Sequence, residues 1–134
     1  MKLPAEQVSL IVTRRLLHDW YANRFVNVAA DDHDGVVGPN SIYASACLLG
    51  VLAFDAVVGS DVQVKCGGKL YVQAGAPIIV GAEVVSDLVG LGVPRGSVAT
   101  VRYQVVGRAM SPAANGELFL LDFRPYTVFG ANAS

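Results

Sequence analysis

The chain has 134 residues, of which 53% are hydrophobic, and this predicts one domain over residues 1–134 that buries a core without disulfides or metals. Ten Lys and Arg against eleven Asp and Glu leave a net charge of −1, which argues against a nucleic-acid partner. The N-terminus lacks the pattern of a signal peptide, and Asp55 interrupts the apolar run of residues 42–58, so no membrane segment is expected. Cys47 and Cys66 fall in apolar stretches, and two buried free thiols fit a cytoplasmic location.

The first forty residues leave one choice open. The β-branched stretch "EQVSLIVT" predicts a strand followed by a short helix, "RRLLHDWYANR", that Thr13 caps, whereas residues 5–22 also fit a single helix. The stretch "RFVNVAA" is typical of an extended segment. After it comes "ADDHDGVVGPN", in which three carboxylates and a histidine occupy positions 31–34. This acidic stretch is predicted to be a loop.

The stretch "SIYASACLLGVLAFDAVV" predicts a helix over residues 41–58, with Asn40 or Ser41 as its N-cap and Gly59 as its stop. Its apolar residues cover nearly every direction around a helix axis. A helix of this kind is enclosed by protein on all sides.

From residue 61 onward the sequence predicts strands. Four β-rich runs are separated by Gly, Pro and Asn: "DVQVKCGGKLYVQ", "APIIVGAEVVSDL", "SVATVRYQVVGRAM" and "GELFLLDFRPYTVF". The stretch "SPAANGEL" predicts a hairpin turn with Asn115-Gly116 at its tip. A buried helix followed by antiparallel strands indicates an α+β fold in which the sheet wraps the helix.

Two stretches carry a resemblance to the hotdog fold. "GKLYVQAGAPIIVGAEVVSDL" resembles the strand, turn and strand that follow the hotdog helix, and "SVATVRYQVVGRAMSPAANGELFLL" resembles the closing hairpin. The order of the elements upstream, an Asp-rich loop and then "GP" leading into a helix, is similar to the MaoC-like hydratases and dehydratases. The resemblance covers about residues 12–129. It implies a hotdog fold, a curved antiparallel β-sheet around a central buried helix, that pairs edge to edge as a homodimer or a dimer of dimers.

The resemblance implies hydration or dehydration of an acyl thioester, which needs a base, an acid and donors for the thioester oxygen. The acidic stretch predicts Asp32 and His33 as the acid–base pair, with Asp31 and Asp34 beside them. Capping and solubility explain Asp31 and Asp34 equally well.

The remaining site residues are predicted to bind the substrate. Amides near Asn40 and Ser41, at the start of the helix, would hold the thioester oxygen. Tyr43 would face the pocket and Arg95 would contact a phosphate of coenzyme A, although core packing explains Tyr43 better and a solvated turn explains Arg95 better.

The predicted partner is an acyl thioester of coenzyme A or of a carrier protein, with coenzyme A or phosphopantetheine entering as part of the substrate and no separate cofactor. No metal is expected, because adjacent side chains point in different directions and cannot all ligate one ion. Two alternatives stay open: a hotdog thioesterase, and a non-catalytic hotdog domain that binds a small apolar ligand or serves as an assembly subunit. The Asp–His spacing of the MaoC-like group is not intact here, which favours the non-catalytic alternative.

Overall fold

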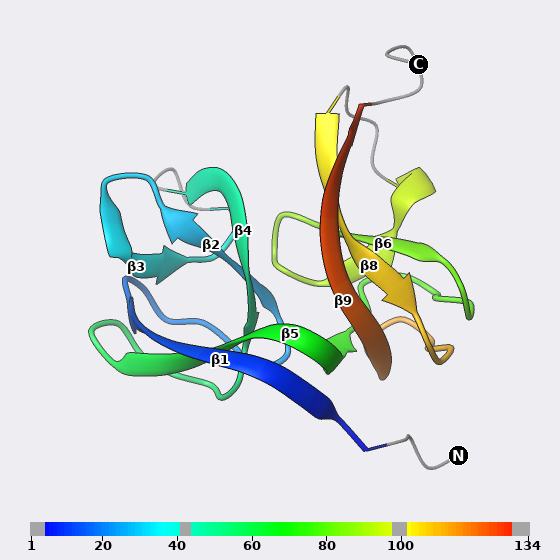
Figure 1. Cartoon of the computed structure of the whole chain (residues 1–134), viewed down its shortest axis with the longest axis horizontal. Helices are drawn as coiled ribbons and strands as arrows, with labels where there is room; N and C mark the ends of the chain where they lie inside the picture. Colours follow the sequence, from blue (N-terminus) through cyan, green and yellow to red (C-terminus); the bar gives the residue numbers. More distant parts are fainter. Residues whose placement is uncertain (1–4, 41–43, 98–101, 130–134) are drawn as a thin grey trace.

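The computed structural model describes residues 5–40, 44–97 and 102–129, which form one mixed nine-stranded sheet without an α-helix (Figure 1). In chain order the elements are β1 Gln7–Leu16, β2 Phe25–Ala29, β3 Asp32–Val37, β4 Ala44–Leu52, β5 Asp61–Gln73, β6 Glu83–Ser86, β7 Gly92–Pro94, a 3₁₀ turn Arg95–Ser97, β8 Arg102–Ala109 and β9 Leu118–Phe129. The prediction of an α+β hotdog fold is therefore wrong. The fold is all-β.

The first five strands close into a barrel. Their order is β1-β3-β2-β4-β5, and β5 pairs again with β1. The closing ladder between β1 and β3 is parallel and short, with Arg15 opposite Gly35 and Leu16 opposite Val36, whereas β1 and β5 pair antiparallel over most of β1. We call this part the barrel half, and it lies at the left of Figure 1.

The other strands extend from β5 in the order β9-β8-β6-β7 and form the second half (Figure 1). β5 belongs to both halves, because its beginning pairs with β1 and its end, from Gly68 to Gln73, pairs with β9. An isolated parallel bridge between Ala74 and Gly92 joins β7 back to the end of β5. The second half thus closes by one bridge, where the barrel half closes by a ladder.

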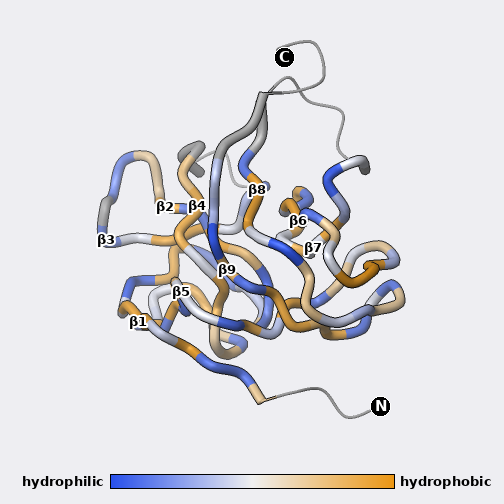
Figure 2. The backbone as a smooth tube through the Cα atoms, turned by 45° about the vertical axis from the view of Figure 1, so that its right-hand side comes forward, coloured by the Kyte–Doolittle hydropathy of each residue, from blue (hydrophilic) through white to orange (hydrophobic). Residues whose placement is uncertain are grey.

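Strands β2 and β4 form a wall between two hydrophobic cores. Successive residues of a strand point to opposite faces. Phe25 and Val51 therefore face the core of the second half, while Val26 and Leu52 face the core of the barrel. Figure 2 shows hydrophobic positions along the strands of both halves. The barrel core contains Leu16, Trp20, Val26, Val36, Leu52, Val62 and Val64. The second core contains Phe25, Val51, Leu70, Val72, Ala74, Ile78, Val84, Val106, Ala109, Phe119, Leu121 and Phe123.

This wall explains why the predicted helix over residues 41–58 is wrong. Residues 44–52 form β4, and residues 53–60 form the loop to β5. A strand with a core on each face is apolar at consecutive positions, so its sequence lacks the alternation that marks a half-exposed strand. The apolar run that indicated an enclosed helix is therefore divided between the strand β4 and the loop that follows it.

The other local predictions have mixed outcomes. The single helix over residues 5–22 is wrong, and so is the short helix, because β1 extends to Leu16 and a loop follows it. The extended "RFVNVAA" and the four β-rich runs are confirmed by β2, β5, β6, β8 and β9. The Asn115-Gly116 turn is confirmed as well, since Glu117 N donates to Ala114 O at 3.0 Å.

Candidate functional surfaces

The acidic stretch forms a strand start, where a loop was predicted. Asp31 lies in the turn after β2, and Asp32, His33 and Asp34 begin β3. Asp31 and Asp34 are exposed, and Asp34 N donates to Asp32 Oδ1 at 3.1 Å. Figure 2 colours this turn as hydrophilic. Asp32 thus organises a local turn on the barrel surface, while the acid–base roles assigned to these residues stay a prediction.

The helix that was predicted to carry the oxyanion site is wrong, because residues 44–52 form β4, and the oxyanion role of Asn40 and Ser41 stays a prediction. Asn40 is exposed in the turn after β3, and Ser41 and Tyr43 lie outside the described residues. Arg95 lies in the second half, on the 3₁₀ turn after β7, where it pairs with Glu83. Of the predicted substrate-binding residues, the structure thus describes Asn40 and Arg95, and they lie on different turns, after β3 and after β7.

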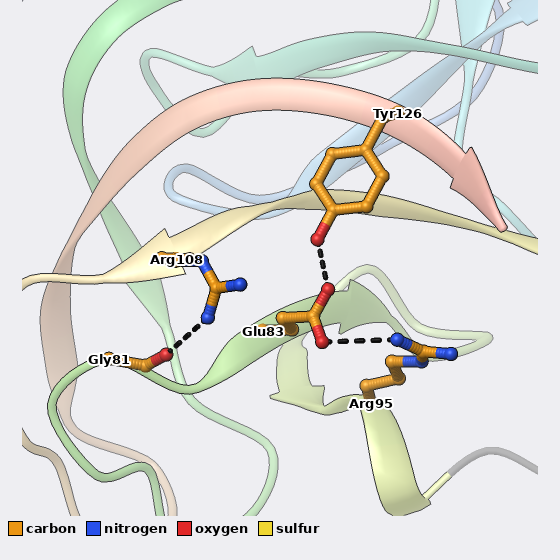
Figure 3. Close-up of polar contacts among 5 residues, drawn as sticks. All are labelled: Gly81, Glu83, Arg95, Arg108 and Tyr126. Atoms are coloured by element: carbon orange, nitrogen blue, oxygen red, sulfur yellow. Dashed lines mark hydrogen bonds and ion pairs between the residues drawn. The ribbon is translucent and has the colours of Figure 1, made fainter.

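A polar cluster around Glu83 was not predicted from the sequence (Figure 3). The Tyr126 hydroxyl donates to Glu83 Oε2, and Arg95 Nη1 donates to Glu83 Oε1 at 3.1 Å. The hydrogen bond from Tyr126, together with Arg95, lowers the pKa of Glu83, and the same hydrogen bond raises the pKa of Tyr126. Arg108 donates nearby to Gly81 O at 3.0 Å.

This cluster is a clamp between strands. Its members come from β6, β9 and the 3₁₀ turn, and Glu83 and Tyr126 are 43 residues apart in the chain. Only the strand order of the second half, in which β8 lies between β6 and β9, brings them together. No spacing in the sequence signals such a contact.

The cysteines offer no buried pair. Neither forms a disulfide; Cys47 is exposed and Cys66 is half-buried, so the prediction of two buried thiols is wrong for Cys47. Burial raises the pKa of the Cys66 thiol, and the charge of Arg14 partly offsets that rise.

Three loops are joined by hydrogen bonds at one surface of the molecule: residues 17–24 between β1 and β2, 53–60 between β4 and β5, and 87–91 between β6 and β7. Trp20 and Ala56 exchange two backbone hydrogen bonds, of 3.0 and 3.1 Å. Asp55 Oδ1 accepts from Ala22 N at 2.7 Å. The third loop joins the first through Arg24 Nη1, which donates to a backbone oxygen at 3.4 Å. The three loops thus form one connected surface.

Exposed apolar side chains gather on these loops. We call them the three-loop surface: Tyr21, Phe54, Val57, Val58, Leu88 and Val89. A recess of about 320 Å³ lies at one of these loops, between β4 and β5, and is lined by Phe54, Asp55, Ala56, Asp61, Val62 and Gln63. Apolar side chains around a recess with carboxylates are suited to contact with another molecule.

The described residues contain no group of three or more His, Cys, Asp or Glu side chains placed to hold a metal ion. Within the same residues, no helix has the length and apolar character needed to span a bilayer.

Comparison with known proteins identifies relatives of a different kind from those the sequence suggested. A family model described as phage cement protein matches residues 22–121. Among solved structures, the N base of head fiber gp8.5 from bacteriophage phi29 is similar, with a TM-score of 0.60 and 21% sequence identity over 86% of this chain and 93% of that chain. At this identity the likeness concerns the fold alone. No curated protein matches the chain.

These findings overturn the predictions that depended on the hotdog resemblance. The chain is not a MaoC-like hydratase or dehydratase, and the thioesterase alternative fails with it, because the family match covers most of the chain and the residues that the structure describes include no α-helix for the sheet to enclose. The predicted acyl-thioester partner, with its coenzyme A or phosphopantetheine, is wrong for the same reason. The homodimer drawn from hotdog pairing and the cytoplasmic location are wrong as well.

Proposed function

The chain belongs to the phage cement protein family, and from this premise we propose that it binds capsid proteins on the phage head as a structural component of the virion. The observation that carries the proposal is the family match over residues 22–121. The fold supports it, since a solved structure that is similar to this chain is the base of a phage head fiber. The proposed function is thus adhesive.

The structure suits such a role. Strand closure in the barrel half removes free edges, and the loops between strands are tied to each other by hydrogen bonds. A protein that holds neighbouring subunits together binds them more tightly if its binding surfaces are already ordered, because little conformational entropy is then lost on binding.

Co-sedimentation with capsid shells of the same phage, assembled without this protein, tests the proposal. We expect the protein to pellet with the shells in a saturable manner and to raise the temperature at which the shells lose their contents, because a ligand that binds only the intact state stabilises it. An unrelated protein of similar mass serves as the control. Protein that stays in the supernatant at saturating shell concentration would refute the proposed function.

A further inference from the structure

The three-loop surface has a backbone that is held in place before any partner arrives. Two aspartates fix its loops: Asp55 Oδ1 accepts from Ala22 N at 2.7 Å, and Asp19 Oδ1 accepts from Val58 N at 2.9 Å. The loop between β6 and β7 has a similar aspartate, whose Oδ1 accepts from two backbone N–H groups at 2.9 and 3.0 Å. The first two aspartates thus tie their loops to each other, and the third stabilises its own turn. The exposed apolar residues are therefore presented on an ordered scaffold.

The exposure of these residues is large for apolar side chains. Phe54 is 69% exposed and Val57 is 62% exposed, and both belong to the same loop. Tyr21 lies on the loop between β1 and β2, and the carbon of the Arg24 guanidinium lies 4.6 Å from its ring centre. Aromatic side chains and arginine are enriched at protein–protein contacts.

Charge narrows the choice of partner. The three loops contain Asp19, Asp55 and Asp87 against Arg24, and Asp61 follows directly in the recess. In a two-fold contact between copies of the chain, the same surface would face itself and like charges would meet. The favoured occupant is therefore a different protein that carries basic side chains.

We propose that the three-loop surface is the face that docks on the capsid protein, which meets it with apolar side chains flanked by lysine or arginine. The inference rests on the proposed function. It adds to that function the face of the molecule that binds and the chemistry of the partner's surface.

The test compares two double variants in the same capsid co-sedimentation assay. Phe54→Ser with Val57→Ser removes apolar area from the three-loop surface. Ile79→Ser with Val80→Ser is the matched control, because those residues are 72% and 62% exposed on the loop between β5 and β6. We expect the first pair to weaken binding about tenfold or more and the control pair to leave it unchanged. Thermal unfolding of both variants checks that each still folds.

The charge argument has a variant of its own. Asp55→Asn with Asp87→Asn removes two negative charges and keeps a side-chain oxygen that accepts the same backbone N–H groups. We expect weaker binding at low salt and a smaller loss of affinity as salt is added.

Each outcome decides between the two claims. Wild-type protein that fails to bind shells refutes the proposed function itself. If wild-type protein binds and the Phe54→Ser, Val57→Ser variant binds equally well, the docking face is wrong while the function stands. Loss of binding only in the Ile79→Ser, Val80→Ser variant would place docking on the other loop. A light-scattering mass of two or more chains that falls to one chain in the first variant would show a self-interface and overturn the inference.

Discussion

The two halves of the molecule differ in how their first and last strands are joined. In the barrel half, β1 pairs with both β3 and β5, so every strand is hydrogen-bonded to a neighbour on each side and the barrel is closed. In the second half, a single bridge between Ala74 and Gly92 joins the last strand of the sheet back to the end of β5. The first arrangement depends on backbone ladders. The second depends more on side chains, namely the large core around Phe119 and the clamp around Glu83.

The halves are also coupled, because they share β5 and the wall made by β2 and β4. Alternate residues of that wall serve different cores, as Phe25 and Leu52 do. The wall belongs to the barrel half, but some of its side chains pack in the second core. A substitution in the wall can therefore lower the stability of either half, depending on which core the side chain faces.

The largest expected effect comes from the wall. Phe25→Ala leaves a cavity in the second core and should lower the free energy of unfolding by about 3–5 kcal/mol, and Leu52→Ala should lower it by about 2–5 kcal/mol through the barrel core. Urea unfolding measures the totals. Hydrogen exchange should then increase first in β8 and β9 for Phe25→Ala, and first in β1 and β3 for Leu52→Ala. Equal increases in all strands for both variants would mean that the two cores open as one unit.

Gly68, where β5 passes from one half to the other, gives the next largest effect. Its φ of +95° disfavours any side chain, and a Cβ there would overlap the carbonyl oxygen of Gln7 on β1. Gly68→Ala should cost about 2–4 kcal/mol, because backbone strain and a steric overlap add together.

Gly116 is the matched control, with a φ of +89° and no atom within 4 Å of an added Cβ. Gly116→Ala should cost only about 1 kcal/mol, from the backbone strain alone. Chemical denaturation measures the free energy of unfolding of both variants. Similar losses in the two would show that the steric overlap at Gly68 contributes little.

The sequence indicated local structure better in the second half than in the barrel. The strands after residue 61 are bounded by Gly, Pro and Asn, and some of them alternate visibly, so their positions could be predicted. β4 could not, since its two apolar faces erase the alternation. The helix predicted over residues 41–58 made an all-β chain resemble an α+β fold, and the resemblance to an enzyme family depended on that helix.

The candidate surfaces were harder still to predict. The acidic stretch suggested a site because four titratable residues are adjacent in the chain. The contact of Glu83 with Tyr126 and the junction of the three loops instead join residues that are far apart in the chain. Such contacts depend on strand order. Exposed apolar residues such as Phe54 were assigned to a buried helix, and only the loop conformation shows that they face solvent.

A partly buried ion pair anchors the start of β1 in the barrel half and gives a smaller effect. Lys65 Nζ lies 2.6 Å from Glu6 Oε2, which also accepts from Tyr71 N at 2.7 Å. Lys65 is only 7% exposed, so Glu6→Gln leaves its charge without a counterion and should lower stability by about 1–3 kcal/mol. Adding Lys65→Met should recover most of that loss, because an apolar side chain needs no counterion there. Urea unfolding of the double variant tests this, and no recovery would show that Lys65 has another role.

The smallest expected effect concerns the clamp of the second half, and it appears as a dependence on pH. The pKa of Glu83 is lowered below its usual 4.5, chiefly by the Tyr126 hydroxyl and also by Arg95. The unfolded chain therefore binds this proton more readily, and the stabilisation is present above about pH 4.5 and lost as the pH falls through the folded-state pKa. The pKa of Tyr126 is raised above 10.0, so its stabilisation is present below that value and lost as the pH rises through the folded-state pKa. Glu83→Gln should flatten the acid side of the stability profile, and Tyr126→Phe should reduce the slope on both sides. Hydrogen exchange in β6 and β9 should report the loss at low pH while β1 and β5 stay protected. If the barrel strands lose protection in parallel, the clamp stabilises the whole sheet, and the two halves do not differ in how they are held closed.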